Sequence, residues 1–122
     1  MKTAFLVLLA AALTNAQYSG LMFFKDSGDC PQQTESESQT SFTYDAGGGN
    51  LCFSNPYSSD DLDVAFSGEL IGTNEVAPAK LGGCPTSSCD SGCTTVDVEA
   101  SGNGIQVDCA EFSGASYIYL GQ

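Results

Sequence analysis

The chain has 122 residues, a formal net charge of −12 and no histidine or arginine, and fifteen acidic side chains outnumber three lysines. This charge repels phosphate backbones and anionic lipids, so we expect neither a nucleic-acid nor a membrane partner. The residue types that most often serve as catalytic bases or phosphate clamps are missing, so we expect no enzyme.

Residues 1–16 read MKTAFLVLLAAALTNA, with one basic residue, an apolar run from Ala4 to Leu13, and small residues before a cut after Ala16. This pattern predicts a secretory signal peptide, and the apolar run is too short to span a bilayer stably. We therefore expect a secreted, extracellular protein whose mature part, residues 17–122, is a single domain.

The mature part shows no long helical periodicity. Gly, Ser, Thr, Asn and Asp interrupt it about every eight to twelve residues, which is typical of an all-β sandwich or barrel. The expected strands are Gly20–Lys25, Gln39–Tyr44, Asn50–Ser54, Leu62–Ser67, Val76–Leu81, Thr94–Ala100, Gly104–Cys109 and Ser116–Leu120.

The clearest strand pattern lies near the C-terminus. Apolar and polar residues alternate in 94–100 and again in 104–109, and Ser-Gly-Asn-Gly between them predicts a β-hairpin with a tight turn. A third β-prone run, 116–120, follows, and we expect it to complete a small antiparallel sheet that Cys109 clamps.

The two halves of the mature chain show a similar order of features. Each has a strand leading into Cys-Pro, a second strand, a glycine turn, a strand near a cysteine and a last strand after a Ser-containing loop. An internal duplication explains this order. We therefore expect an antiparallel β-sandwich of two sequential four-strand units, about 17–68 and 69–122, each supplying one apolar face.

All six cysteines lie in the mature part, which indicates a disulfide framework in an exported chain of this size. A metal site at the closely spaced last cysteines is a weaker reading, because there is no histidine and no C-x-x-C spacing. Six cysteines allow fifteen pairings. Equivalence of the two halves predicts bridges Cys30–Cys52 and Cys84–Cys109, with loops worth about 3 kcal/mol each, and leaves Cys89–Cys93 as a local pair.

The aromatic pair Phe23-Phe24, an acidic Gly-containing turn ending in Cys30, and a later cysteine before a Ser-rich loop and strand carry a family resemblance. With these features the chain resembles the small secreted, cysteine-rich, two-motif βγ-crystallin-like proteins of filamentous fungi. It departs from their pattern at 76–81, which lacks the aromatic strand. The resemblance implies Greek-key units and, through killer-toxin-like and effector-like relatives, an extracellular interaction role.

Three kinds of site remain to be weighed. Some βγ-crystallin-like modules bind calcium through a loop that is matched here in part by Asn55, Ser58, Ser59 and Asp60, so calcium is the one cofactor considered. Tyr117 and Tyr119 are the candidates for a carbohydrate platform, because Ile118 and Leu120 compete for the inward face.

Two carboxylate pairs, Asp61/Asp63 and Asp97/Glu99, have the two-residue spacing of a same-face dyad. The solvated face of a strand produces the same spacing, so we assign no catalytic residue.

These patterns together predict a secreted, non-enzymatic interaction protein, effector-like or toxin-like, whose partner is an extracellular protein. The alternative is a structural or wall-associated module that binds polysaccharide or calcium.

Overall fold

The computed structural model describes residues 17–26, 28–72 and 76–122, so the predicted signal peptide lies outside the described residues. The described chain is almost entirely β-structure, with one 3₁₀ turn, η1 (Ala46–Gly48), and no helix that could cross a membrane. The strands are β1 (Gln17–Asp26), β2 (Ser38–Tyr44), β3 (Leu51–Ser54), β4 (Leu62–Ile71), β5 (Lys80–Cys84), β6 (Thr94–Asp97), β7 (Glu99–Ser101), β8 (Gly104–Phe112) and β9 (Tyr117–Gly121).

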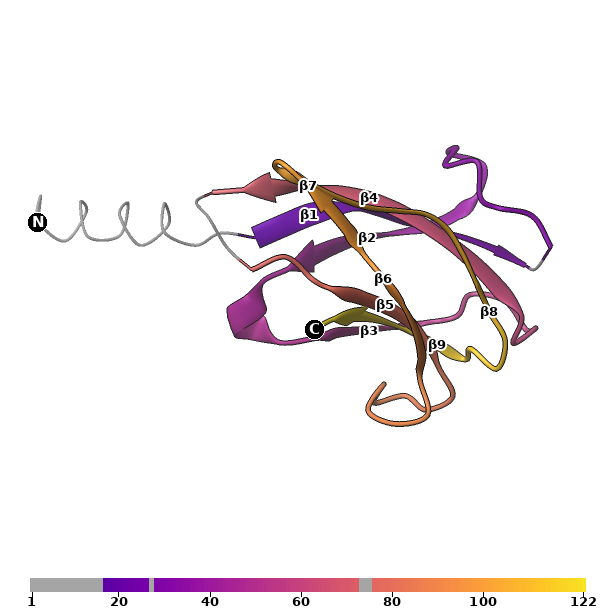
Figure 1. Ribbon diagram of the computed structural model, residues 1–122. Coiled ribbons are helices and arrows are strands. Elements are labelled where there is room, and N and C mark those ends of the chain that lie inside the picture. The colour runs from indigo at the N-terminus through magenta and orange to yellow at the C-terminus, as the bar shows by residue number, and fades with distance from the viewer. Residues whose placement is uncertain (1–16, 27, 73–75) are drawn as a thin grey trace, which may run out of the picture.

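The strands form two antiparallel sheets that face each other as a β-sandwich (Figure 1). The five-stranded sheet has the order β2-β1-β4-β8-β7, and the four-stranded sheet has the order β3-β9-β5-β6. The predicted all-β sandwich is confirmed. Each sheet takes strands from both halves of the chain, however, so the expectation that each half supplies one face as a sequential unit is wrong.

The predicted hairpin is present as β7 and β8, with Ala100 opposite Ile105 and Ser101 opposite Gly104. Gly102 in its turn has φ +58°, a conformation that favours glycine. Two details differ from the expectation. The run 94–100 is split at Val98, where the chain passes from β6 in one sheet to β7 in the other, and β9 pairs with β3 and β5 rather than with β8.

The fifth expected strand is displaced along the chain. We predicted Val76–Leu81, but β5 spans Lys80–Cys84 and includes two adjacent glycines. Pro78 has no N–H to offer a ladder, which disfavours the earlier start. Position 83 requires glycine, because a Cβ there would clash with Phe112 Cβ at 2.7 Å and with Ala115 Cβ at 2.8 Å. Tertiary packing thus requires a residue that strand propensity disfavours.

The core lies between the sheets and is rich in aromatic rings. Phe42 and Phe66 meet edge to face with ring centroids 5.4 Å apart, which favours one relative orientation of β2 and β4. Leu81, Ile118 and Leu120 approach from the four-stranded sheet and are fully buried. The predicted inward direction of the two β9 residues is therefore confirmed.

Three disulfides link the described cysteines, and none of the predicted pairings is correct. The bridges are Cys30–Cys109, Cys52–Cys89 and Cys84–Cys93. The first two bridges join the N-terminal half to the C-terminal half, whereas the prediction assumed that each half forms its own bridge. Strand order explains the error. β3, which carries Cys52, and β5, whose following loop carries Cys89, are both neighbours of β9. Cys30 lies in the loop after β1 and reaches Cys109 of β8 across β4.

Candidate functional site

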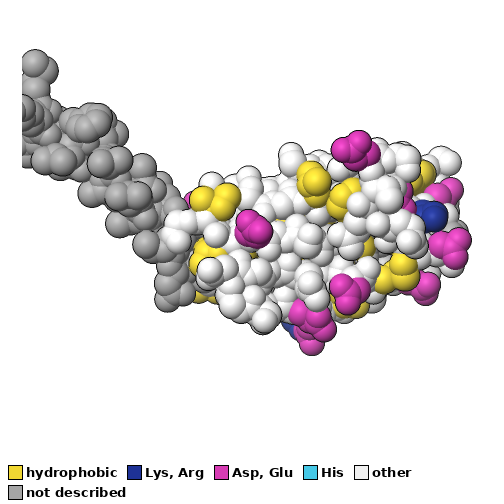
Figure 2. Space-filling model, turned by 90° about the horizontal axis from the view of Figure 1, so that it is seen from above, with side chains coloured by type: hydrophobic (Ala, Val, Ile, Leu, Met, Phe, Trp, Pro, Cys, Tyr) yellow, Lys and Arg dark blue, Asp and Glu magenta, His cyan; other side chains and the backbone are white. Residues whose placement is uncertain are grey.

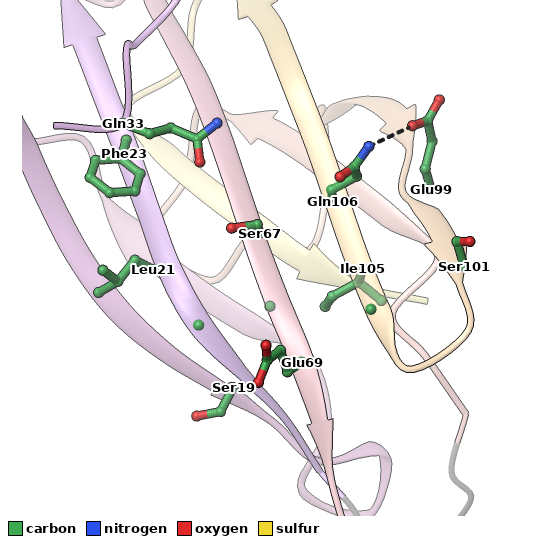
Figure 3. Close-up of a pocket in the computed structure, with 13 residues that line it drawn as sticks. Ser19, Leu21, Phe23, Gln33, Ser67, Glu69, Glu99, Ser101, Ile105 and Gln106 are labelled. Carbon is green, nitrogen blue, oxygen red and sulfur yellow. Dashed lines mark hydrogen bonds between the residues drawn. The ribbon is translucent and has the colours of Figure 1, made fainter.

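A hollow of about 830 Å³ lies on the outer face of the five-stranded sheet (Figure 3). Ser67 of β4 is near its centre, with Leu21 of β1 on one side and Gln106 of β8 on the other. These residues are exposed because they alternate with residues that point into the core. Side chains from three neighbouring, hydrogen-bonded strands therefore form the floor of the hollow.

The lining of this hollow combines uncharged polar groups with apolar side chains and with two carboxylates, Glu69 and Glu99. Hydroxyl groups come from Ser19, Ser67 and Ser101. Gln106 Nε2 donates a hydrogen bond to Glu99 Oε2 at 3.4 Å, which ties β8 to the edge strand β7. Figure 2 shows acidic side chains over the face seen there, several of them gathered around a basic side chain at the end on the right, with hydrophobic groups in small separate areas. Such a surface offers both donors and acceptors to a polar ligand.

The loop of residues 28–37 stands on the outer side of the sheet (Figure 1) and contributes Gln33 to one wall of the hollow. Gln33, with φ +60°, lies over Phe23 at this wall (Figure 3). The Glu37 carboxylate accepts hydrogen bonds from the backbone N–H groups of Gln32, at 2.8 Å, and Thr34, at 3.1 Å. These bonds lower the pKa of Glu37, with the Gln32 bond contributing most. The loop is thus closed by its own carboxylate.

The loop covers one end of the outer face. Phe23 is 6% exposed and Ala65 is fully buried, although both lie outside the core cluster between the sheets. Pro31 is buried within the loop, and the Cys30–Cys109 bridge attaches the loop to β8. A second, smaller packed layer therefore exists on the outside of the five-stranded sheet.

Asp63 is buried beneath this layer, with 2% of its surface exposed. Its Oδ2 atom has no hydrogen-bond partner among the described residues. Burial raises the pKa of Asp63, the negative charges of Glu111 and Asp29 raise it further, and a Gly28 backbone bond and Lys25 oppose them. The expected pairing of Asp61 and Asp63 on one strand face is not found, because Asp61 precedes β4 and is exposed.

A second hollow, of about 550 Å³, lies on the outer face of the four-stranded sheet. The loop after β5, which carries Cys89 and Cys93, forms one side, and the half-buried ring of Tyr119 lines the hollow together with Lys80. Lys80 pairs with Asp97 and lowers its pKa by hydrogen bonding and by charge. Tyr117, the other tyrosine predicted for carbohydrate binding, is half-buried on the same strand but does not line this hollow.

The predicted calcium residues lie together in the loop before β4, but their polar groups already hold that loop. Asn55 Nδ2 donates to the carbonyl oxygens of Ser59, at 2.9 Å, and Ala115, at 2.8 Å, and Asn55 Oδ1 accepts from Tyr57 N–H. Asp60 Oδ1 accepts from the Ser116 hydroxyl, while Ser58 is exposed. Within the described ranges, no three His, Cys, Asp or Glu side chains are grouped to hold a metal ion.

No clear signal for the larger hollow is present in the sequence. Its lining comes from β1, β4, β7, β8 and the 28–37 loop, and the spacing of these segments along the chain does not show that they meet. One weak signal was present: Leu21 occupies an outward position in an alternating strand and is 43% exposed.

Comparisons with protein-family models, with curated proteins and with solved structures found no match to this chain.

Proposed function

We propose that the protein is a secreted, non-enzymatic interaction protein, effector-like or toxin-like, that acts outside the producing cell and binds an extracellular protein through the hollow on the five-stranded sheet. The observation that carries this proposal is the hollow itself. Its floor belongs to three hydrogen-bonded strands, and its lining combines hydroxyl and amide groups with the apolar side chains of Leu21, Phe23 and Ile105. A preorganised surface loses little conformational entropy when a partner binds.

Two further features support this proposal. The N-terminal sixteen residues have the pattern of an export signal, and three disulfides in a small β-protein are compatible with secretion. Cross-linking of this kind restricts local opening, which protects a protein against extracellular proteases. The resemblance to βγ-crystallin-like secreted proteins points in the same direction.

A bulky substitution in the hollow tests the proposal. Ser67→Tyr fills the centre of the floor from an exposed position, whereas Ser41→Tyr adds the same side chain at an exposed position on β2 that does not line the hollow. Purified mature protein is applied to candidate host tissue and competitor cells, and bound extracellular proteins are captured with it. We expect the response and the capture to be lost with Ser67→Tyr and kept with Ser41→Tyr. Equal activity of the two variants would contradict the role of the hollow.

A wall-associated module that binds polysaccharide is the second candidate. Its support is the hollow beside Tyr119, where an aromatic ring, the Thr95 hydroxyl and the Asn50 amide share one lining. Sugar rings stack on aromatic faces, and polar neighbours orient their hydroxyl groups. Sedimentation with insoluble chitin or glucan tests this candidate. Loss of pelleting with Tyr119→Ala, but not with Tyr117→Ala, would assign binding to this hollow and would favour the wall module if no biological response accompanies it.

A further inference from the structure

The buried carboxyl group of Asp63 is unusual for this molecule. The other described acidic residues are exposed, except Glu37, which is half-buried. Asp63 lies between Lys25 of β1 and Glu111 of β8 in the five-stranded sheet. Its neighbours in sequence, Leu62 and Val64, belong to the core between the sheets, so the Asp63 side chain points to the opposite face. It is therefore buried by whatever covers the outside of the sheet.

The cover is the loop of residues 28–37. Gly28 and Asp29, at the start of the loop, lie close enough to the Asp63 carboxyl to act on its pKa, Gly28 lowering it through its backbone N–H and Asp29 raising it by charge. Cys30 fixes the start of the loop to Cys109 of β8. Beyond this bridge, Gln33 reaches over Phe23 and lines the hollow (Figure 3). One loop thus covers the carboxyl with its first residues and builds the wall of the hollow with later ones.

The charges around Asp63 do not favour its ionised form. Glu111 from β8 and Asp29 from the loop are both negative, and Lys25 from β1 is the opposing positive charge. An ionised carboxylate here has one oxygen without a hydrogen-bond donor, which is costly in a buried position. Hydration of that oxygen requires the cover to move.

We propose that the loop of residues 28–37 is a proton-dependent latch: it packs over Asp63 while that carboxyl holds a proton, and it loosens when the proton is lost to water. Because Gln33 belongs to the loop, loosening removes one wall of the hollow. This consequence for binding rests on the proposed function, whereas the latch itself does not.

Glu37 must be ionised for the loop to keep its internal hydrogen bonds, so acidification also acts on the latch. Its ionised carboxylate binds the Gln32 and Thr34 N–H groups and closes the loop from within. Those bonds lower the pKa of Glu37, while burial and two negative neighbours raise the pKa of Asp63. Both contacts of the loop are in place when Glu37 is ionised and Asp63 is protonated. Protonation of Glu37 on acidification weakens the loop from within, and ionisation of Asp63 as the pH rises weakens the packing over that residue.

Amide hydrogen exchange of the loop, corrected for the intrinsic effect of pH on exchange rates, tests the latch without any partner. In the native mature protein we expect protection at Thr34 and Glu37 to fall by about tenfold or more as the pH rises through the titration of Asp63. Asp63→Asn keeps the size of the side chain and removes its charge, so protection should stay high throughout that rise. Asp61→Asn, which removes an exposed carboxyl two residues earlier, should behave like the native protein.

Loop protection that does not change with pH in the native protein, or that falls equally in Asp63→Asn, would overturn the latch. If Asp63→Asn does not fold, a carboxyl carbon NMR titration of the native protein decides the question: Asp63 must titrate above the ordinary range for aspartate, together with the loop amides. Titration at or below that range overturns the proposal. Because no ligand is used, failure here leaves the proposed binding at the hollow untouched.

Discussion

Cys30 and Cys109 are 79 residues apart in sequence, yet their Cα atoms lie 5.5 Å apart across the outside of the five-stranded sheet. Their bridge joins the loop after β1 to the end of β8, and β4 lies between these two strands in the sheet. The covalent link therefore spans the middle of the sheet and holds the loop that forms one wall of the hollow.

Removal of this bridge should cost more stability than removal of the shortest one. Loop-entropy estimates give about 4.5 kcal/mol for a 79-residue loop and about 2.5 kcal/mol for the 9-residue loop closed by Cys84 and Cys93. Cys84 is buried, so its replacement by alanine also costs packing energy, which reduces the difference in stability between the two double variants. We expect Cys30→Ala/Cys109→Ala to be less stable than Cys84→Ala/Cys93→Ala by about 1–2 kcal/mol. Urea denaturation of both double variants measures this, and the reverse order would contradict it.

Gly20→Ala should destabilise the fold strongly. Gly20 of β1 lies opposite Gly68 of β4, and a Cβ at position 20 would lie 2.1 Å from the Ser67 carbonyl oxygen. Backbone must move to relieve this clash, so we expect a loss of about 2–3 kcal/mol in the free energy of unfolding. Gly48→Ala is the matched control, because its nearest contact would be at an ordinary 3.8 Å. Thermal and urea unfolding should show a large loss for the first variant and a small change for the second.

Asp63 should make stability depend on pH in a direction opposite to that of a salt-bridged aspartate. Its pKa is raised in the folded state, so its contribution is fully present below the unfolded value and is lost as the pH rises through the folded value. We expect the free energy of unfolding to fall over that interval. Asp63→Asn should remove this fall and be more stable than the native protein at neutral pH by about 1–2 kcal/mol. A variant that retains the native pH profile would contradict the assignment.

The ion pair between Lys80 and Asp97 should change titration but hardly change stability. Both side chains are well exposed, with 42% and 82% of their surfaces accessible, so solvent screens the pair. Lys80→Met should return the pKa of Asp97 toward its ordinary value, because the lysine bond and charge lower it. Carboxyl NMR titration measures the pKa, and urea denaturation serves as the control. A marked loss of stability would show that Lys80 packs against the sheet in a way that its exposure does not indicate.

Local pattern was sufficient to place most strands. The alternation in 104–109 and the Ser-Gly-Asn-Gly turn correspond to β8 and to the hairpin with β7, because side chains on a strand point alternately to core and solvent. The same logic placed Ile118 and Leu120 inward on β9. Local pattern failed at β5. Gly82 and Gly83 have low strand propensity, but their neighbours pack too closely for a larger side chain.

The site could not be predicted in this way. Nothing in the order of residues shows that Gln33 reaches the sheet face near Ser67, or that Asp63 is covered while Asp61 is exposed. The calcium and carbohydrate residues were chosen by local motif and by alternation. The structure assigns the Asn55 amide to holding its own loop and places Tyr119, but not Tyr117, beside a hollow.

Composition and alternation were enough to predict the all-β class, the approximate strand positions, export and the number of cysteines available for bridges. Those properties follow from composition and from contacts between residues near each other in the chain. The folded arrangement was needed to show the cysteine partners, the mixing of both halves in each sheet and the burial of Asp63. Each depends on which strands become neighbours, and that choice is made by packing the whole core, where β4 and β9 each pair with strands far away in sequence.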